Sequence, residues 1–260
     1  MQRAGDRVSL GSGTPALARV GSVLLDKCTR GGSKRVATAL AKQGFAIIRL
    51  KARLALEDLP RGADSRAIGG KGEGRWMWTL GDALPPPVMA VADEVASVVA
   101  LAQGEHWEES LFGSRHSRPL MCSSMHVLHS EAGCTAQALH RDFKAREVAG
   151  LAEKDPGVPI PVVVLVPAQA GTHLVVVPGS HLMDDEQMAG IDSMPYKHVD
   201  VAVEPGQAIL FVGSLYHGGG AYPKESNTRL HFLLESSSRL RRDEVAEPST
   251  RGDKIFYAHS

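Results

Sequence analysis

The stretch Glu204-Pro-Gly-Gln-Ala-Ile-Leu-Phe-Val212 places a Pro-Gly turn directly before a short run of apolar residues. A marked turn followed by such a run is typical of a buried strand. After about residue 119 the chain repeats this pattern, with apolar runs separated by glycine and proline. The runs are Leu120–Leu128, Val162–Val166, Leu174–Val177, Val199–Val203, Ala208–Val212 and Leu230–Leu234. They predict a closed or sandwiched β architecture.

Two helices are predicted before the β half. From Ser33 to Gln43 apolar residues repeat four apart, with Ser33 placed to cap the helix and Gly44 to end it. The run Phe45–Leu50 then reads as a buried strand. A second helix opens at the three prolines 85–87 and closes at Gly104. Its apolar face consists of Val88, Val91, Val95, Val98, Val99 and Ala102. We expect both helices to pack on the outside of the β core.

The segment 51–84 between these helices is rich in glycine and charge. Glycines 69, 70, 72 and 74 are followed by Trp76 and Trp78. This is not a dinucleotide fingerprint, because no apolar strand leads into it and no helix follows directly. We predict a mobile loop or lid. Its tryptophans, with Trp107, either line a pocket or fill the core.

The composition limits the partners of the chain. Lys and Arg total 29, as do Asp and Glu, so no overall basic field is available to hold a nucleic acid or an anionic membrane surface. No apolar run approaches the roughly 18 residues needed to cross a bilayer. The three cysteines are odd in number and form no CxxC pair, which argues against a disulfide scaffold and a thiolate zinc site. We therefore expect a soluble protein of the reducing cytoplasm.

The length favours one domain, because 260 residues with 43% hydrophobic content can bury one substantial core. We place this domain at 33–240, with a helical part at 33–118 and the β core at 119–240. Residues 1–32 are expected to form a solvated and partly disordered arm, and 241–260 a surface tail. Because the arm is rich in basic residues, an organellar transit peptide is the alternative.

Three side chains predict a metal site. His140 and Asp142 stand two apart, so both project to the same face of an extended chain. Taken alone, His-x-Asp is a weak signal, since surface strands carry such pairs by chance. His217 offers a third ligand at the end of the strand that follows the Pro-Gly turn. Two imidazoles and one carboxylate on one face of iron(II) leave three positions for a cosubstrate and dioxygen.

A cosubstrate anchor is predicted at Arg229. It lies twelve residues beyond His217, across a glycine-rich connection, on what reads as the next strand. A planar guanidinium can bind a carboxylate through two parallel hydrogen bonds. This suits the distal end of 2-oxoglutarate, whose keto acid end would chelate the iron.

Five short motifs, in their order, resemble the phytanoyl-CoA dioxygenase family. They are Leu139-His-Arg-Asp142, Leu174-Val-Val-Val-Pro-Gly-Ser-His181, Glu204-Pro-Gly-Gln-Ala-Ile-Leu-Phe211, His217-Gly-Gly-Gly220 and Asn227-Thr-Arg229. Their order is more specific than any one of them. The resemblance implies a mainly β fold with flanking helices and a double-stranded β-helix core of the cupin or jelly-roll type. It also implies iron(II) held by His140, Asp142 and His217, and 2-oxoglutarate held by Arg229.

The chain departs from the family's pattern at several positions. Gly171-Thr172 stands where members commonly show Asn-Gly, and Thr172 is taken as a candidate cosubstrate contact. A Lys or Gln that helps to bind 2-oxoglutarate has His129 as its nearest counterpart here. His181 is expected to stabilise a turn. Asp142 is retained, whereas halogenating relatives replace it with Gly or Ala, so halogenation is not expected.

The implied reaction couples oxidative decarboxylation of 2-oxoglutarate to oxidation of a C–H bond in a small-molecule metabolite, usually by hydroxylation. Desaturation or ring closure would use the same residues. A non-oxidative metal-binding enzyme of cupin type and a catalytically silent β-helix binding protein are the alternatives. Basic residues near the motif suggest an anionic substrate, unless they are simply solvated; the oligomeric state is left open. These residues are Arg115, His116, Arg118, His126, His129, Arg141 and His173.

Overall fold

The computed structural model describes residues 30–60, 65–68, 74–81, 83–106, 120–154, 160–184, 186–188 and 197–236. The helices are α1 (Arg30–Gln43), α2 (Pro86–His106) and α3 (Ala145–Lys154), with short 3-10 helices η1 (Leu56–Asp58) and η3 (Ser180–Leu182). The strands are β1 (Phe45–Arg49), β2 (Arg66–Ala67), β3 (Arg75–Thr79), β4 (Leu120–Ser130), β5 (Val162–Pro167), β6 (Thr172–Val176), β7 (Val199–Val203), β8 (Gln207–Val212), β9 (His217–Gly219) and β10 (Asn227–Ser236). Within these ranges every helix is too short or too polar to cross a bilayer.

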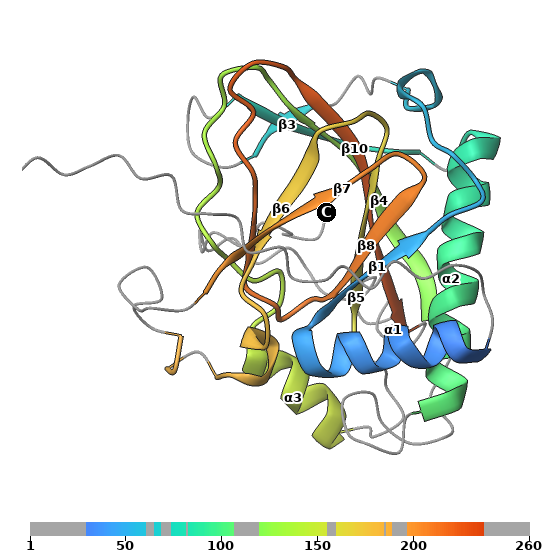
Figure 1. Ribbon diagram of the computed structural model, residues 1–260, viewed down its shortest axis with the longest axis vertical. Helices are drawn as coiled ribbons and strands as arrows, with labels where there is room; N and C mark the ends of the chain where they lie inside the picture. The colour runs from blue at the N-terminus through green and yellow to red at the C-terminus, as the bar shows by residue number, and fades with distance from the viewer. Residues whose placement is uncertain are drawn as a thin grey trace, which may run out of the picture.

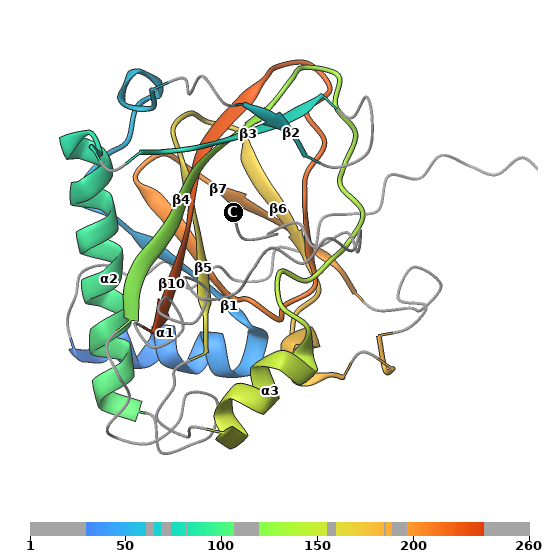
Figure 2. The ribbon, with the colours of Figure 1, turned by 180° about the vertical axis from the view of Figure 1, so that it is seen from behind.

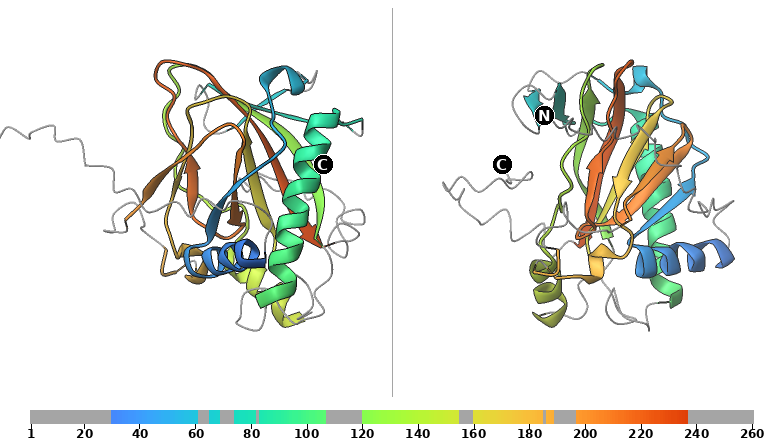
Figure 3. Two further views of the ribbon diagram at one scale, coloured as in Figure 1. Left: turned by 45° about the vertical axis from the view of Figure 1, so that its right-hand side comes forward. Right: turned by 60° about the vertical axis from the view of Figure 1, so that its left-hand side comes forward.

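The strands form two antiparallel sheets (Figure 1). The larger has seven strands in the order β1-β8-β5-β10-β4-β3-β2, and the smaller has three in the order β7-β6-β9. Apolar residues of both sheets meet in one core cluster, so the small sheet faces the large one. Helices α1 and α2 contact each other and lie outside the strands (Figures 2 and 3). This arrangement confirms the predicted mainly β fold with flanking helices.

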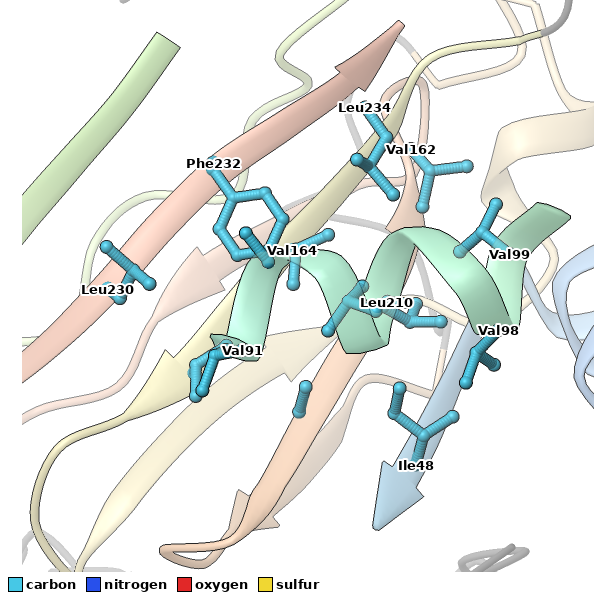
Figure 4. Close-up of a cluster of buried hydrophobic side chains, with 14 of the residues drawn as sticks. Ile48, Val91, Val98, Val99, Val162, Val164, Leu210, Leu230, Phe232 and Leu234 are labelled. Carbon is cyan, nitrogen blue, oxygen red and sulfur yellow. The ribbon is translucent and has the colours of Figure 1, made fainter. Parts of the chain in front are cut away.

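Alternation along the central strands gives the large sheet its two faces. On β8, Leu210 packs toward the helices, while Ile209 and Phe211 pack toward the small sheet. On β10, Leu230 and Phe232 likewise face the helices. Figure 4 shows valines of α2 packed over the residues of this outer face. Among the described residues, the faces that the two sheets turn toward each other are therefore free of helices and can enclose a site.

Several predicted elements are confirmed and others are corrected. The apolar face of α2 is buried throughout, and Gly44 ends α1 with a φ of 85°. The predicted cap at Ser33 is wrong, because α1 begins at Arg30 and Ser33 is buried inside it. The predicted loop at 51–84 is wrong over Arg75–Thr79, which pairs with β4 as strand β3.

Other predictions concern residues outside the described ranges. These are most of the N-terminal arm, Trp107, the segment 115–118 and the tail 241–260. The two described tryptophans are not among the residues that line the pocket at the candidate site. Trp78 is buried and donates from its indole nitrogen to the carbonyl of Pro60 at 2.7 Å, while Trp76 donates to Glu131 at 2.8 Å.

Candidate metal centre

The two histidines are brought together by backbone pairing between distant segments. His217 begins β9, and its N–H and carbonyl exchange hydrogen bonds with those of His140, at 2.9 and 2.8 Å. The imidazole rings then lie 4.6 Å apart between centroids. His217 also packs against Phe211 of the large sheet, with 4.5 Å between ring centroids. We predicted His217 at the end of the strand that follows the Pro-Gly turn. That strand is β8, which ends at Val212, and a turn separates it from β9, where His217 lies.

Asp142 completes the group. Its Oδ1 lies 3.9 Å from Nε2 of His140 and 3.8 Å from Nε2 of His217, too far for hydrogen bonds. All three candidate ligand atoms lie within 4.8 Å of one another. Among the described residues this is the one group of three or more His, Cys, Asp or Glu side chains so arranged. The predicted triad thus converges on one point.

The donor set fits a divalent metal ion. Nδ1 of His140 lies 3.0 Å from the carbonyl of Ala138, and Nδ1 of His217 lies 3.0 Å from that of Leu215. These bonds fix the proton on Nδ1 and turn the Nε2 lone pairs toward Asp142. Both carboxylate oxygens of Asp142 are buried with no hydrogen-bond partner in the structure. A buried carboxylate of this kind is costly unless a cation compensates it.

Burial shifts the pKa values of His140, Asp142 and His217 in the metal-free protein. It lowers the pKa of His217 to about 4 and, with a contribution from His217, also lowers the pKa of His140. Burial raises the pKa of Asp142 to about 6, against an opposing effect of His140. Both imidazoles are therefore neutral near pH 7 and can serve as ligands.

The group opens into a pocket between the two sheets. Its walls are mostly apolar, and five of its twelve lining residues are polar or charged. It is lined by Ile68, Met77, Leu128, Gln137, His140, Leu165, Leu174, Phe211, His217, Gly219, Arg229 and His231. Arg229 is on β10, as predicted, and is 2% exposed. The structure thus brings the predicted anchor and the two predicted histidine ligands into one pocket.

The two other candidate cosubstrate contacts lie elsewhere. His129 faces away from the pocket. It pairs with Thr228 of β10, and its Nδ1 lies 2.8 Å from the Thr228 hydroxyl. Thr172 donates to Asn227 at 3.0 Å, and Arg229 donates to the same oxygen at 3.5 Å. Thr172 therefore supports Arg229 through Asn227 and is not itself a lining residue.

The sequence prediction missed three polar residues of the site: Gln137 and His231, which line the pocket, and Arg75. Arg75 is 1% exposed and reaches the site from β3, where its guanidinium donates to the Ser130 hydroxyl at 2.9 Å and to the carbonyl of Gly220 at 2.7 Å. Gln137 accepts from the N–H of Gly219 at 3.0 Å. The alternation of Arg75 and Met77 with the two tryptophans was a signal for a strand, but not for the place of Arg75 in the site.

Residues 79–224, more than half of the chain, match the family described as phytanoyl-CoA dioxygenase (PhyH). The chain belongs to the phytanoyl-CoA dioxygenase family. This confirms the resemblance. The metal group lies inside the matched range, whereas Arg75 and Arg229 lie just outside its two ends.

Two curated relatives carry the name dioxygenase. Dioxygenase cdmA of Talaromyces verruculosus is 40% identical over 100 residues, which cover 36% of this chain and 32% of the relative. Dioxygenase trt7 of Aspergillus terreus is 32% identical over 151 residues, which cover 55% of this chain and 44% of the relative. The chain thus matches less than half the length of either relative.

Solved structures of the same fold include two that were solved with iron. The epimerase SnoN from nogalamycin biosynthesis, solved with Fe3+, alpha ketoglutarate and nogalamycin RO, has a TM-score of 0.59 and 16% identity over 86% of this chain and 93% of that one. EctD from S. alaskensis, solved with bound Fe, has a TM-score of 0.52 and 16% identity over 85% and 83%. At these identities the likeness shows the shared fold and confirms the cupin-type core.

Proposed function

We propose that this protein is an Fe(II)- and 2-oxoglutarate-dependent dioxygenase that hydroxylates a C–H bond of a small organic molecule and releases succinate and carbon dioxide. One observation carries the proposal. Both buried oxygens of Asp142 lack a hydrogen-bond partner, and its Oδ1 lies 3.9 Å and 3.8 Å from the Nε2 atoms of His140 and His217, which line the pocket that also contains Arg229.

The protein's own residues would hold the reactants and keep water out. His140, Asp142 and His217 would occupy one side of the ion and leave the other side open. Iron(II), when bound there, would supply the redox chemistry that activates dioxygen. The guanidinium of Arg229 would bind the distal carboxylate of 2-oxoglutarate, with Arg75 beside it as a second buried cation. Apolar walls such as Phe211 and Leu174 would limit the water in the pocket.

The two alternatives explain fewer of these residues. A non-oxidative cupin-type enzyme has no use for two buried arginines beside its metal group. A silent binding protein gains nothing from a buried carboxylate without a hydrogen-bond partner, which would only cost stability. Family membership points the same way.

The basis for an anionic main substrate is narrower than the sequence suggested. Arg141 bonds to the backbone of η3, His173 bonds to Asp200, and His129 faces away from the pocket. Of the arginines, Arg229 lines the pocket and Arg75 is joined to it through the Ser130 hydroxyl, and both suit the cosubstrate. We propose a small-molecule substrate, and the test must include neutral compounds as well as acids.

The experiment is succinate formation from 2-oxoglutarate, with and without iron(II), across amino acids, organic acids, phosphonates and neutral terpenoids. We expect iron-dependent succinate that one class of compound stimulates. Succinate at the same rate in Asp142→Ala protein would overturn the proposal. Stimulation by neutral compounds alone would rule out an anionic main substrate and would leave the proposed reaction unchanged.

A further inference from the structure

Arg141 lies between two of the candidate metal ligands in the sequence, and its side chain leads away from the site. In this stretch His140 and Asp142 direct their ligand atoms toward the metal group. The guanidinium of Arg141 instead donates to the carbonyl of Ser180 at 2.7 Å and to that of Met183 at 2.8 Å. One side chain thus anchors the ligand segment to η3 from behind.

The same guanidinium also contacts the segment of the third ligand. Its central carbon lies 4.5 Å from the centre of the Tyr216 ring, and Tyr216 directly precedes His217. The N–H of Tyr216 donates to the hydroxyl of Ser180 at 2.9 Å. Ser180 is fully buried. It accepts a hydrogen bond from each of the two ligand segments, at its carbonyl from Arg141 and at its hydroxyl from Tyr216.

We propose that Arg141 is a positioning residue, which holds His140, Asp142 and His217 at the separation that a divalent metal requires. The inference rests on the proposed function, because it assumes that the group binds a metal. Arg141 would act through geometry and not through charge. A positive charge close to the site weakens the binding of a cation. We therefore attribute the role of Arg141 to the contacts that its side chain makes.

Arginine suits this position better than lysine. Its planar fork can donate to two carbonyls at once and stack on an aromatic ring, whereas an ammonium offers no planar face. Partners that orient metal ligands typically contribute about 10- to 100-fold to metal affinity. A loss of this size is expected when both carbonyl bonds and the stacking contact disappear.

The test compares Co(II) binding to the full-length metal-free protein, followed by anaerobic titration and by the absorption spectrum of the bound ion. The variants are Arg141→Met, Arg141→Lys and the matched control Arg146→Met, which removes an exposed arginine on α3. We expect Arg141→Met to weaken Co(II) binding by about 10- to 100-fold and to change the spectrum. Arg141→Lys should lie between this variant and the wild type, and Arg146→Met should match the wild type.

The absorption spectrum of bound Co(II) distinguishes a change in ligand positions from a loss of stability. A folded protein whose metal site is unchanged gives an unchanged spectrum. If Arg141→Met binds Co(II) with wild-type affinity and spectrum below its unfolding midpoint, the proposal is overturned. Should Arg141→Met not fold, a wild-type spectrum and affinity in Arg141→Lys would overturn it equally. If the wild type itself binds no Co(II), the proposed function fails and this inference fails with it.

Discussion

Arg75 and Arg229 donate hydrogen bonds to the same acceptor, the hydroxyl of Ser130, at 2.9 and 3.1 Å. Both guanidiniums are buried, and they come from strands on either side of β4. Among the described residues no carboxylate pairs with Arg75, whose other bonds go to backbone carbonyls. Two buried cations that share a neutral acceptor form a site that an anionic ligand would stabilise.

The first prediction concerns this cation pair. Arg229→Leu should raise the KM for 2-oxoglutarate far more than the KM for the main substrate, because the variant loses a charge-assisted pair in a dry pocket. The cost is about 2 to 5 kcal/mol. Succinate formation at varied 2-oxoglutarate measures it, and Co(II) affinity should stay at the wild-type value. Equal increases in both KM values would place the anchor elsewhere, with Arg75 as the next residue to test.

The second prediction concerns Asp142 in the metal-free protein. Burial raises the pKa of this carboxyl to about 6, above its ordinary value of 3.8, so the folded state disfavours its charge. The ionised group therefore costs stability above pH 6, and this cost disappears as pH falls below about 4. We expect Asp142→Asn to stabilise the metal-free protein at pH 7 by on the order of 2 kcal/mol, and to have little effect near pH 4.

Denaturant unfolding at the two pH values measures this difference. Adding Co(II) provides the control, since metal should stabilise the wild type and leave the variant unchanged. A variant that is less stable than the wild type at pH 7 without metal would show that Asp142 has a structural partner.

How much of the site could be predicted depended on how local its signals are. His140, Asp142, His217 and Arg229 stand in compact motifs whose order resembles that of a known family, so they could be selected as candidates from the sequence. Arg75 stands in a glycine-rich segment, and its role comes from pairing between β3 and β4, which brings it beside Ser130. No local pattern carries that information, since it depends on which distant strands become neighbours.

His129 shows the converse error. The prediction fixed its strand but not its face, and alternation along β4 puts Leu128 in the pocket and His129 on the opposite side. A shift of one residue reverses a strand's two faces, so a face assigned without knowing the register is unreliable. The helices were easier, because the apolar stripe of α2 itself identifies its buried face.

The third prediction is a pH dependence of stability at the contact between β6 and β7. His173 on β6 lies 2.8 Å from a carboxylate oxygen of Asp200 on β7, and this bond, against an opposing effect of burial, raises the pKa of His173. A raised histidine pKa contributes stability below the unfolded value of about 6.5, and loses it as pH rises through the folded pKa. Because the pair is partly exposed, we expect about 1 kcal/mol or less.

Unfolding of Asp200→Asn and wild-type protein at pH 6 and pH 9 tests this contribution. The variant should be the less stable protein at pH 6, and the two should agree at pH 9. A difference of the same size at both pH values would mean that the hydrogen bond, and not the charge of His173, stabilises the contact between β6 and β7.

The last prediction uses the glycines that follow His217. A Cβ added at Gly218 would lie 2.9 Å from the backbone carbonyl oxygen of Gln137, which cannot move without disturbing the pairing of its segment with β9. A Cβ at Gly219 would instead lie 2.7 Å from the side-chain oxygen of Gln137 and 2.9 Å from a guanidinium nitrogen of Arg75. The two positions therefore disturb different parts of the site.

Gly218→Ala should destabilise the fold by about 1 to 3 kcal/mol and weaken Co(II) binding, because the ligand segments are forced apart. Gly219→Ala should mainly raise the KM for 2-oxoglutarate, since side chains at the cation pair must shift while the metal ligands stay in place. Gly150→Ala on α3 is the control. Nothing lies within 4 Å of its added Cβ, so it should be neutral or stabilise the helix by up to about 1 kcal/mol. If Gly219→Ala weakened Co(II) binding and left the KM for 2-oxoglutarate unchanged, the cation pair would not be the cosubstrate anchor.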